Sequence, residues 1–212
     1  MKLRKSEIGV LAIIIASIGL GLYAYPMLPE KVASHWGMNG EVNGYMPSFW
    51  GAFLMPMISI AMFLIFLVIP RIDPKKQNIE KFRKYFDAFI ILFFLFLFYL
   101  DALTIYWNLG GRFNMTQMLA PAFGVLFFAI GIMVSHAESN WSIGIRTPWT
   151  LSNVTVWKKT HALGGRLFMY SGVLALGGVV VPQIAIWLML VPVLLTALVT
   201  VVYSYLEYRK IK

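Results

Sequence analysis

The sequence predicts an all-α membrane protein, a bundle of six transmembrane helices that forms a single membrane domain over residues 1–212. Hydrophobic residues make up 59% of the chain and charged residues only 13%, about half the charged share of an ordinary soluble domain. The apolar residues are also gathered into long runs. Most of these runs approach the roughly 20 residues that a helix needs to cross a hydrocarbon core of about 30 Å.

The first three apolar runs cover residues 8–28, 49–69 and 86–107. The first lacks the small-residue cleavage site of a signal peptide, so we expect it to be retained as a span. Small side chains suit close packing between helices in a membrane. On the first run they share one helical face, which predicts a helix contact there through Gly9, Ala12, Ala16 and Gly19.

The last three runs cover residues 118–135, 167–181 and 184–206. The fifth is short, but a helix that begins near Ser152 can continue through Gly164 and Gly165 into it. Small residues lie on one face of the fourth run and recur every seven residues along the fifth. Both patterns predict close helix contacts, through Gly124, Gly131 and Ser135 in the fourth run and through Gly164, Ser171 and Gly178 in the fifth.

Nearly all basic residues fall on one side of the predicted bundle. Of the 18 lysine and arginine residues, all but Lys31 and Arg112 flank the spans on the side of the termini, Lys2 and Lys212 included. The positive-inside rule therefore predicts a multi-pass protein of the cell membrane with both termini in the cytoplasm. The net charge of +9 then reflects orientation toward anionic lipid. We expect membrane lipids as partners and no direct nucleic-acid binding.

The predicted topology divides the chain into two parts. Residues 1–84 hold spans one and two with an extracellular loop at 29–48, and residues 85–212 hold the other four spans with a cytoplasmic motif at 136–166. The extracellular loop is rich in glycine and asparagine, which predicts successive turns, including Asn39 and above all the dipeptide Asn43-Gly44. The loop is either a binding surface or an ordered cap whose glycines serve positive φ angles. Its candidate ligand-sensing residues are His35, Trp36, Gly37, Gly40, Asn43, Gly44 and Tyr45.

The polar stretch 144–166 lies between two apolar runs on the predicted cytoplasmic side. Thr150 or Ser152 can cap a helix that begins near Asn153, with Trp157 buried. The stretch is either an interfacial connector or a docking site for a cytoplasmic partner or a small anionic ligand, for which the fork of Arg146 is suited. Its candidate residues are Arg146, Thr147, Pro148, Trp149, Ser152, Asn153, Trp157, Lys158, Thr160 and His161.

Asp101 is the one acidic residue well inside a span. An intramembrane acid is costly and requires a partner, for which Arg112 or the backbone of the extracellular loop is the nearest candidate. Its role is either functional or a contact that fixes the bundle. His136, Glu138 and His161 lie on one predicted side and are candidate zinc ligands. Their spacing fits no dense motif, and we expect no cofactor. The absence of cysteine excludes thiolate sites, and no motif of a known enzyme class is present.

Two stretches resemble the SdpI family of bacterial immunity proteins. The outer pattern Leu28-Pro29…Val32…His35-Trp36-Gly37…Gly40…Gly44-Tyr45 is similar to a loop of that family. The inner pattern Gly144-Ile145-Arg146-Thr147-Pro148-Trp149-Thr150-Leu151-Ser152, with Val156-Trp157, Thr160-His161 and Gly164-Gly165, resembles its second and longer motif. Ala33 stands where a proline is common and Asn43 where an aspartate is common. Asn43 therefore weakens any proposal that the outer loop binds a cation through a carboxylate.

The resemblance implies an integral membrane immunity and signalling protein, not an enzyme, in which residues 85–212 form the SdpI-like region. Such a protein gives resistance to a secreted peptide toxin outside and can sequester a repressor protein inside. We expect the outer loop to sense the toxin and the inner motif to report it. Two alternatives remain: a membrane enzyme or metalloprotein acting at the cytoplasmic face, and a small transporter with Asp101 as its coupling site.

Overall fold

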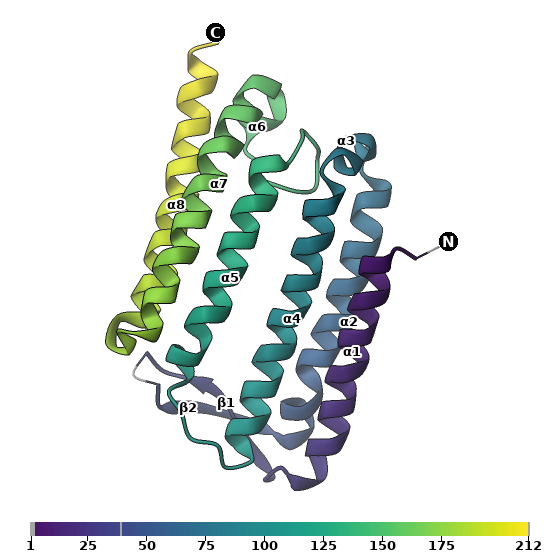
Figure 1. The fold of residues 1–212 in the computed structure, drawn as a ribbon, viewed down its shortest axis with the longest axis vertical. Coiled ribbons are helices and arrows are strands. Elements are labelled where there is room, and N and C mark those ends of the chain that lie inside the picture. The colour runs from purple at the N-terminus through teal and green to yellow at the C-terminus, as the bar shows by residue number, and fades with distance from the viewer. Residues whose placement is uncertain (1–2, 39, 212) are drawn as a thin grey trace.

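Six long helices run side by side in the computed structural model, which describes residues 3–38 and 40–211 (Figure 1). All six are long and apolar enough to cross a membrane, which confirms the predicted spans. Lys2 and Lys212 of the predicted topology and Asn39 of the predicted turns lie outside the described residues. The long helices are α1 (Lys5–Ala24), α2 (Ser48–Ile72), α4 (Arg83–Asn108), α5 (Met115–His136), α7 (Val154–Leu176) and α8 (Ala185–Arg209).

Short elements connect the long helices at both ends of the bundle. At one end lie α3 (Lys76–Lys81), α6 (Pro148–Ser152) and both chain ends, and we call this the terminal end. At the opposite end a hairpin of β1 (Lys31–Trp36) and β2 (Val42–Pro47) packs under the helices, and we call this the hairpin end. Short 3-10 turns extend three of the helix ends, at Tyr25–Met27, Gly177–Val179 and Pro182–Ile184.

The helices form two groups of three. In the first, α1, α2 and α4 enclose a core of phenylalanine side chains. Phe66 of α2 lies with its ring centroid 6.1 Å from that of Phe86 and 5.4 Å from that of Phe93, both on α4. In the second group, α7 lies between α5 and α8. The two groups meet along α4 and α5, where the ring of Phe96 packs edge-on against Phe123 at 5.0 Å.

The second group is held together by very close backbone contact. A Cβ atom added to Gly131 of α5 would lie 2.5 Å from the carbonyl oxygen of Gly165 and 2.7 Å from the amide nitrogen of Met169, both on α7. A Cβ on Gly172 of α7 would likewise lie 2.6 Å from the carbonyl oxygen of Gly124. The small-residue face predicted for the fourth span is therefore a helix contact. It fits the general pattern of small residues between membrane helices.

The small residues predicted to recur along α7 meet α8 as well as α5. A Cβ on Gly164 would lie 3.0 Å from Cγ2 of Thr200, and Ser171 shares a hydrogen bond of 3.1 Å with Thr196. Gly178 lies between Ala120 of α5 and Ala185 of α8. Helix α7 thus has one small-residue face for each neighbour. Its observed start at Val154 confirms that the helix continues through Gly164 and Gly165.

The helix contact predicted on α1 through its small residues is wrong. Gly9 and Gly19 have nothing within 4 Å of an added Cβ, and Ala12 and Ala16 are exposed. The buried face of α1 is instead the one that carries Glu7, Val10, Ile14 and Ser17. Larger apolar and polar side chains on that face fill the space against α2 and α4, so the small residues are left on the outside of the bundle.

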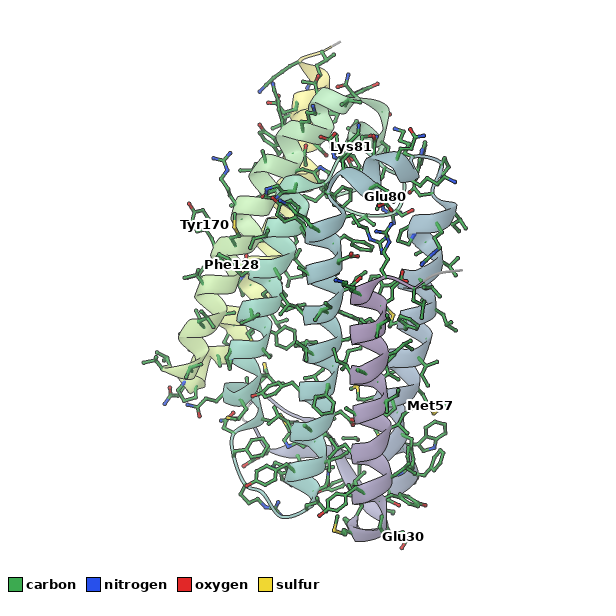
Figure 2. The ribbon with its side chains drawn as sticks, turned by 45° about the vertical axis from the view of Figure 1, so that its right-hand side comes forward. Glu30, Met57, Glu80, Lys81, Phe128 and Tyr170 are labelled. Atoms are coloured by element: carbon green, nitrogen blue, oxygen red, sulfur yellow. The ribbon has the colours of Figure 1, made fainter. Side chains whose placement is uncertain are left out.

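Met57, Phe128 and Tyr170, labelled in Figure 2, are also exposed on the outside, as expected of helices that contact lipid.

The turns predicted for residues 29–48 are mostly replaced by strands. Asn43 and Gly44 lie within β2, and the chain reverses instead between Gly37 and Glu41, whose backbones are hydrogen bonded at 2.8 Å. Gly44 pairs with His35 across the hairpin, where an added Cβ would lie 2.9 Å from Cβ of His35. The glycine is therefore required by a close strand contact, not by a turn.

Candidate functional site

The loop that connects α5 to α6 at the terminal end is organised around Asn140. The side chain of Asn140 is 0% exposed. Its amide donates to the carbonyl oxygens of Glu138 (2.8 Å) and Ile143 (2.9 Å), and its oxygen accepts from the amides of Ser142 (2.8 Å) and Ile143 (2.6 Å). A buried amide with all of its hydrogen-bonding groups satisfied holds a loop in one conformation.

Asp73, at the end of α2, ties this loop to the first helix group. Its buried carboxylate accepts hydrogen bonds from the amide of Lys75 (2.7 Å), the amide of Trp141 (3.0 Å) and the hydroxyl of Ser142 (2.5 Å). Asn78 of α3 adds a donor to the carbonyl oxygen of Ser139 at 2.7 Å. The connection therefore bridges two parts of the chain that are more than 60 residues apart.

His161 and Trp157 of α7 fix the other side of the same loop. The Nε2 atom of His161 accepts from the amide of Ile145 at 3.0 Å, so its proton is on Nδ1, which donates to the carbonyl oxygen of Trp157 at 2.8 Å. The indole of Trp157 stacks on the imidazole at 3.9 Å and donates to the carbonyl oxygen of Ala137 at 2.7 Å. Gly144 passes so close that an added Cβ would lie 2.4 Å from Nε2. Both ring nitrogens of His161 are therefore used within the fold.

The start of α6 is a helix cap that also contacts α8. Thr147 accepts from the amide of Thr150 at 3.1 Å, and Thr150 accepts from the amide of Thr147 at 2.9 Å, a reciprocal arrangement that satisfies free amides at a helix N-terminus. Thr147 also donates to the hydroxyl of Ser204 of α8 at 3.0 Å. Asn153 then caps α7 through the amides of Thr155 and Val156.

The candidate residues of the inner motif therefore separate into two sets. Thr147, Trp157, Thr160 and His161 are buried, and Thr147, Trp157 and His161 support the loop through hydrogen bonds. Arg146, Pro148, Ser152 and Lys158 are exposed, and Trp149 and Asn153 are partly exposed. Arg146 folds back to donate to the carbonyl oxygen of Trp141. A docking surface at this end can be formed only by the exposed set.

The three candidate metal ligands do not form a metal site. Within residues 3–38 and 40–211 there is no group of three histidine, cysteine, aspartate or glutamate side chains that could hold a metal ion. The ring of His136 stacks on Tyr85 at 3.7 Å and bonds through Nδ1 to the carbonyl oxygen of Ile132. Because the nitrogens of His161 are both engaged, it has no lone pair left for a metal.

The hairpin is anchored to the bundle by Asn108 at the end of α4. Its side-chain oxygen accepts from the amide of Ala33 at 2.7 Å, and its amide donates to the carbonyl oxygen of the same residue at 3.0 Å. Trp36 packs edge-on against Trp107 at 5.6 Å, and Val32 is buried against Gly51. Of the candidate sensing residues, His35, Asn43 and Tyr45 are exposed, and Tyr45 is 64% exposed. The remaining described candidates, Trp36, Gly37, Gly40 and Gly44, are partly buried.

Two comparisons with known families match these two regions. A domain of unknown function, DUF1648, matches residues 12–60, which hold most of α1, the hairpin and the first half of α2. The SdpI/YfhL protein family matches residues 136–204, which hold the loop at the terminal end, α6, α7 and most of α8. The chain is also 26% identical over 208 residues to the Immunity protein SdpI of Bacillus subtilis (strain 168), an alignment that covers 98% of each chain. The chain is therefore similar to this immunity protein over nearly its whole length. No solved structure matches it.

Asp101 does not pair with the partners expected from the sequence. Its carboxylate, 1% exposed within α4, accepts a hydrogen bond of 2.6 Å from the hydroxyl of Ser17 on α1. Arg112 instead donates to the carbonyl oxygens of Trp107 and Gly111 and lies over the ring of Trp107 at 4.3 Å. The prediction of Arg112 as a partner is therefore wrong, because this side chain folds onto the turn between α4 and α5.

Several residues that organise the fold were missed in the sequence. Asp73 and Asn108 form hydrogen bonds with backbone groups that are far away in the sequence. Asn140 does so within an irregular loop. No local sequence pattern marks any of the three. Ser17 was missed for the same reason. A weak signal did exist for Asn140, because a polar run directly after an apolar span must satisfy its own backbone groups.

Proposed function

We propose that this chain is a membrane immunity protein that protects the cell carrying it from a secreted peptide toxin. The observation that carries the proposal is the similarity to the Immunity protein SdpI over 98% of both chains. The six helices that are apolar enough to span a membrane agree with it. The likeness extends over both polar ends of the bundle as well as the spans, so it includes the surfaces on which such a function would depend.

In this proposal the terminal end faces the cytoplasm and the hairpin faces outward. The lysine and arginine residues support this orientation, because all of them except Lys31 and Arg112 fall in segments on the side of the termini. Anionic lipid at the cytoplasmic surface favours the same placement. The hairpin then carries His35, Asn43 and Tyr45 as exposed groups on an anchored support, which suits a surface that meets a peptide.

The terminal end would carry the response. Arg146 on the loop, Pro148, Trp149 and Ser152 on α6, and Lys158 on α7 are wholly or partly exposed there. The backbone of the loop is held by buried polar groups. A rigid surface with a guanidinium and an indole is the kind that binds another protein well, because arginine and tryptophan carry much of the energy of protein interfaces. A cytoplasmic repressor is the partner that the proposal assigns to it.

Substitutions at the two surfaces should cause different defects, in protection from the toxin and in binding of a cytoplasmic protein. A toxin-sensitive bacterial strain would be transformed with the chain and challenged with the peptides secreted by the bacterium from which the chain comes. Survival of the transformed strain is expected, and Tyr45→Ala should reduce protection because it removes the most exposed aromatic side chain of the hairpin. Tyr23→Ala is the matched control, since Tyr23 is exposed on α1 and outside the hairpin. Absence of protection by the unchanged chain would contradict the proposal.

In the same cells, the Arg146→Ala variant should still protect the cell from the toxin. It should no longer copurify with a cytoplasmic protein that copurifies with the unchanged chain. Arg166→Ala is the control, because Arg166 is an exposed arginine of α7 outside the α5–α6 loop. Membrane-fraction immunoblots would confirm equal amounts of every variant. If Arg146→Ala and Arg166→Ala retain the same cytoplasmic proteins, the response surface does not include Arg146.

A further inference from the structure

A positively charged pocket lies at the terminal end, among basic residues whose placement in the sequence indicates only the orientation of the chain. It has a volume of about 370 Å³, within the range of roughly 300–1,000 Å³ typical of small-ligand sites. It is formed where the segment before α1 meets the end of α2, the short helix α3 and the start of α4. Its charged lining residues are Arg4, Arg71, Lys76, Glu80 and Arg83.

Arg83 is the most informative residue of this pocket. Its side chain is 8% exposed, and its Nε atom donates to Asp87 at 2.6 Å. Its Nη2 atom is buried and donates no hydrogen bond to any described residue, although it lies 3.7 Å from the carboxylate of Glu7. A buried guanidinium nitrogen without an acceptor is costly. The Nη1 atom of Arg83, on the same guanidinium, lies 3.9 Å from the lining carboxylate of Glu80.

The nearby carboxylate of Glu7 is already occupied by other donors. Its Oε1 atom accepts from Nη2 of Arg71 at 2.7 Å, and its Oε2 atom accepts from the amide of Arg4 at 2.9 Å. Glu7 is buried and sits behind the arginines, so it holds them in place and is not a lining residue. It therefore holds the guanidinium of Arg71 and the backbone of Arg4 at the wall of the pocket, and it lies 3.7 Å from the guanidinium of Arg83.

The charges that line the pocket leave an excess of positive charge. Four cationic side chains face one lining acid, Glu80, whose Oε1 atom accepts from Arg4 at 2.6 Å. Figure 2 shows Glu80 and Lys81 on the same short helix, and only Glu80 lines the pocket. Several cationic side chains around one space favour a ligand with several oxygens, because guanidinium and ammonium groups donate charge-assisted hydrogen bonds to phosphate.

We propose that this pocket binds a phosphate group of an anionic ligand. The ligand is either an anionic phospholipid headgroup or a soluble phosphate compound, since the same oxygens would be recognised in both. Arg71 comes directly after the apolar run of α2, at the depth where headgroups lie. The pocket is formed by elements that do not include Arg146 or the loop before α6, so it is independent of the proposed docking surface.

The test uses the purified full-length chain in detergent, after lipid removal. One arm titrates inorganic phosphate and pyrophosphate and follows the midpoint of thermal unfolding. The other adds dioleoylphosphatidylglycerol or dioleoylphosphatidylcholine and counts bound lipids by native mass spectrometry. Preferential retention of phosphatidylglycerol would assign the site to a lipid, and stabilisation by the inorganic anions alone would assign it to a soluble ligand. No response in either arm overturns the proposal.

Three exposed residues make the test specific. Lys76→Gln should weaken binding roughly threefold to tenfold, the size of one partly solvated charge-assisted contact. Glu80→Gln should strengthen binding by a similar factor, because it removes the lining acid and frees Arg4. Lys81→Gln removes the same charge from the same helix outside the pocket and should leave affinity unchanged. If Lys81→Gln and Lys76→Gln weaken binding equally, the effect is general surface charge and the pocket is not a site.

Discussion

Replacing Gly131 by alanine is expected to lower the free energy of unfolding by about 2–3 kcal/mol, the upper part of the range for overpacking a close contact. The added Cβ would lie 2.5 Å from the carbonyl oxygen of Gly165 and 2.7 Å from the amide nitrogen of Met169. These are backbone atoms, so no side-chain rotation can relieve the contact. The helices α5 and α7 would have to move apart, which would also loosen the packing of α7 on α8.

The measurement is the midpoint temperature of thermal unfolding of the detergent-solubilised protein. Unfolding is monitored as the loss of its monodisperse peak in size-exclusion chromatography. Gly19→Ala is the control, because it is the same change within a helix and meets nothing within 4 Å. Its midpoint should equal that of the unchanged chain or exceed it slightly, since alanine favours helix more than glycine does. Equal midpoints for Gly131→Ala and Gly19→Ala would contradict the close contact between α5 and α7.

Replacing Gly144 by alanine should release the loop at the terminal end and cost about 3 kcal/mol or more. Its φ of +118° is a conformation that a residue with a side chain adopts only at a cost of roughly 1–3 kcal/mol. The Cβ would also lie 2.4 Å from Nε2 of His161, and the hydrogen bond from the amide of Ile145 to the same atom would be lost at a further cost of about 1 kcal/mol.

Limited digestion with trypsin measures this release, because Arg146 follows two residues after the glycine and would become cleavable once the loop is free. Gly110→Ala is the matched control. Gly110 has a similar φ of +108° but nothing within 4 Å of an added Cβ, so it carries the backbone strain without the steric contact. Rapid cleavage at Arg146 in Gly144→Ala and not in Gly110→Ala is expected. Equal cleavage in the two variants would show that His161 does not hold the loop.

The spans were predictable because their signal is local. In lipid, the backbone N–H and C=O groups of a run of about 20 apolar residues must form their hydrogen bonds within the same helix. The positions of α1, α2, α4, α5 and α8 therefore follow from composition alone. The continuation of α7 through Gly164 and Gly165 was also predictable, because the polar residues before it keep the same period. The burial of Trp157 was predicted on that basis and is confirmed.

The side on which a helix packs was not predictable from small residues alone. Gly131 and Gly19 look alike in the sequence, yet only Gly131 touches another helix. A glycine permits close approach, and whether a neighbour uses it depends on the other helices. In α1 the face with Glu7 and Ser17 was buried instead, because both residues find partners on α2 and α4, 64 and 84 positions further along the chain.

The hairpin and the charged pocket were missed because both depend on distant residues. The strand β1 is fixed by Asn108, which lies 75 positions beyond Ala33. The positions of Arg71 and Arg83 depend on Glu7 in the same way. In the sequence, Arg71 and Arg83 formed part of a basic loop that explained the net charge. Only the fold shows that these residues line a pocket.

The loop between α5 and α6 ties the second helix group to the first, through Asp73. Within the second group the backbones of α5 and α7 touch, which resists sliding of these two helices past one another. The contact between α4 and α5 consists of larger side chains such as Phe96 and Phe123, which tolerate a change of angle. The hairpin is fixed to α4, and Asp73 fixes the loop to α2. A tilt of the first group against the second would therefore have to break the hydrogen bonds from Trp141 and Ser142 to Asp73 or deform this loop.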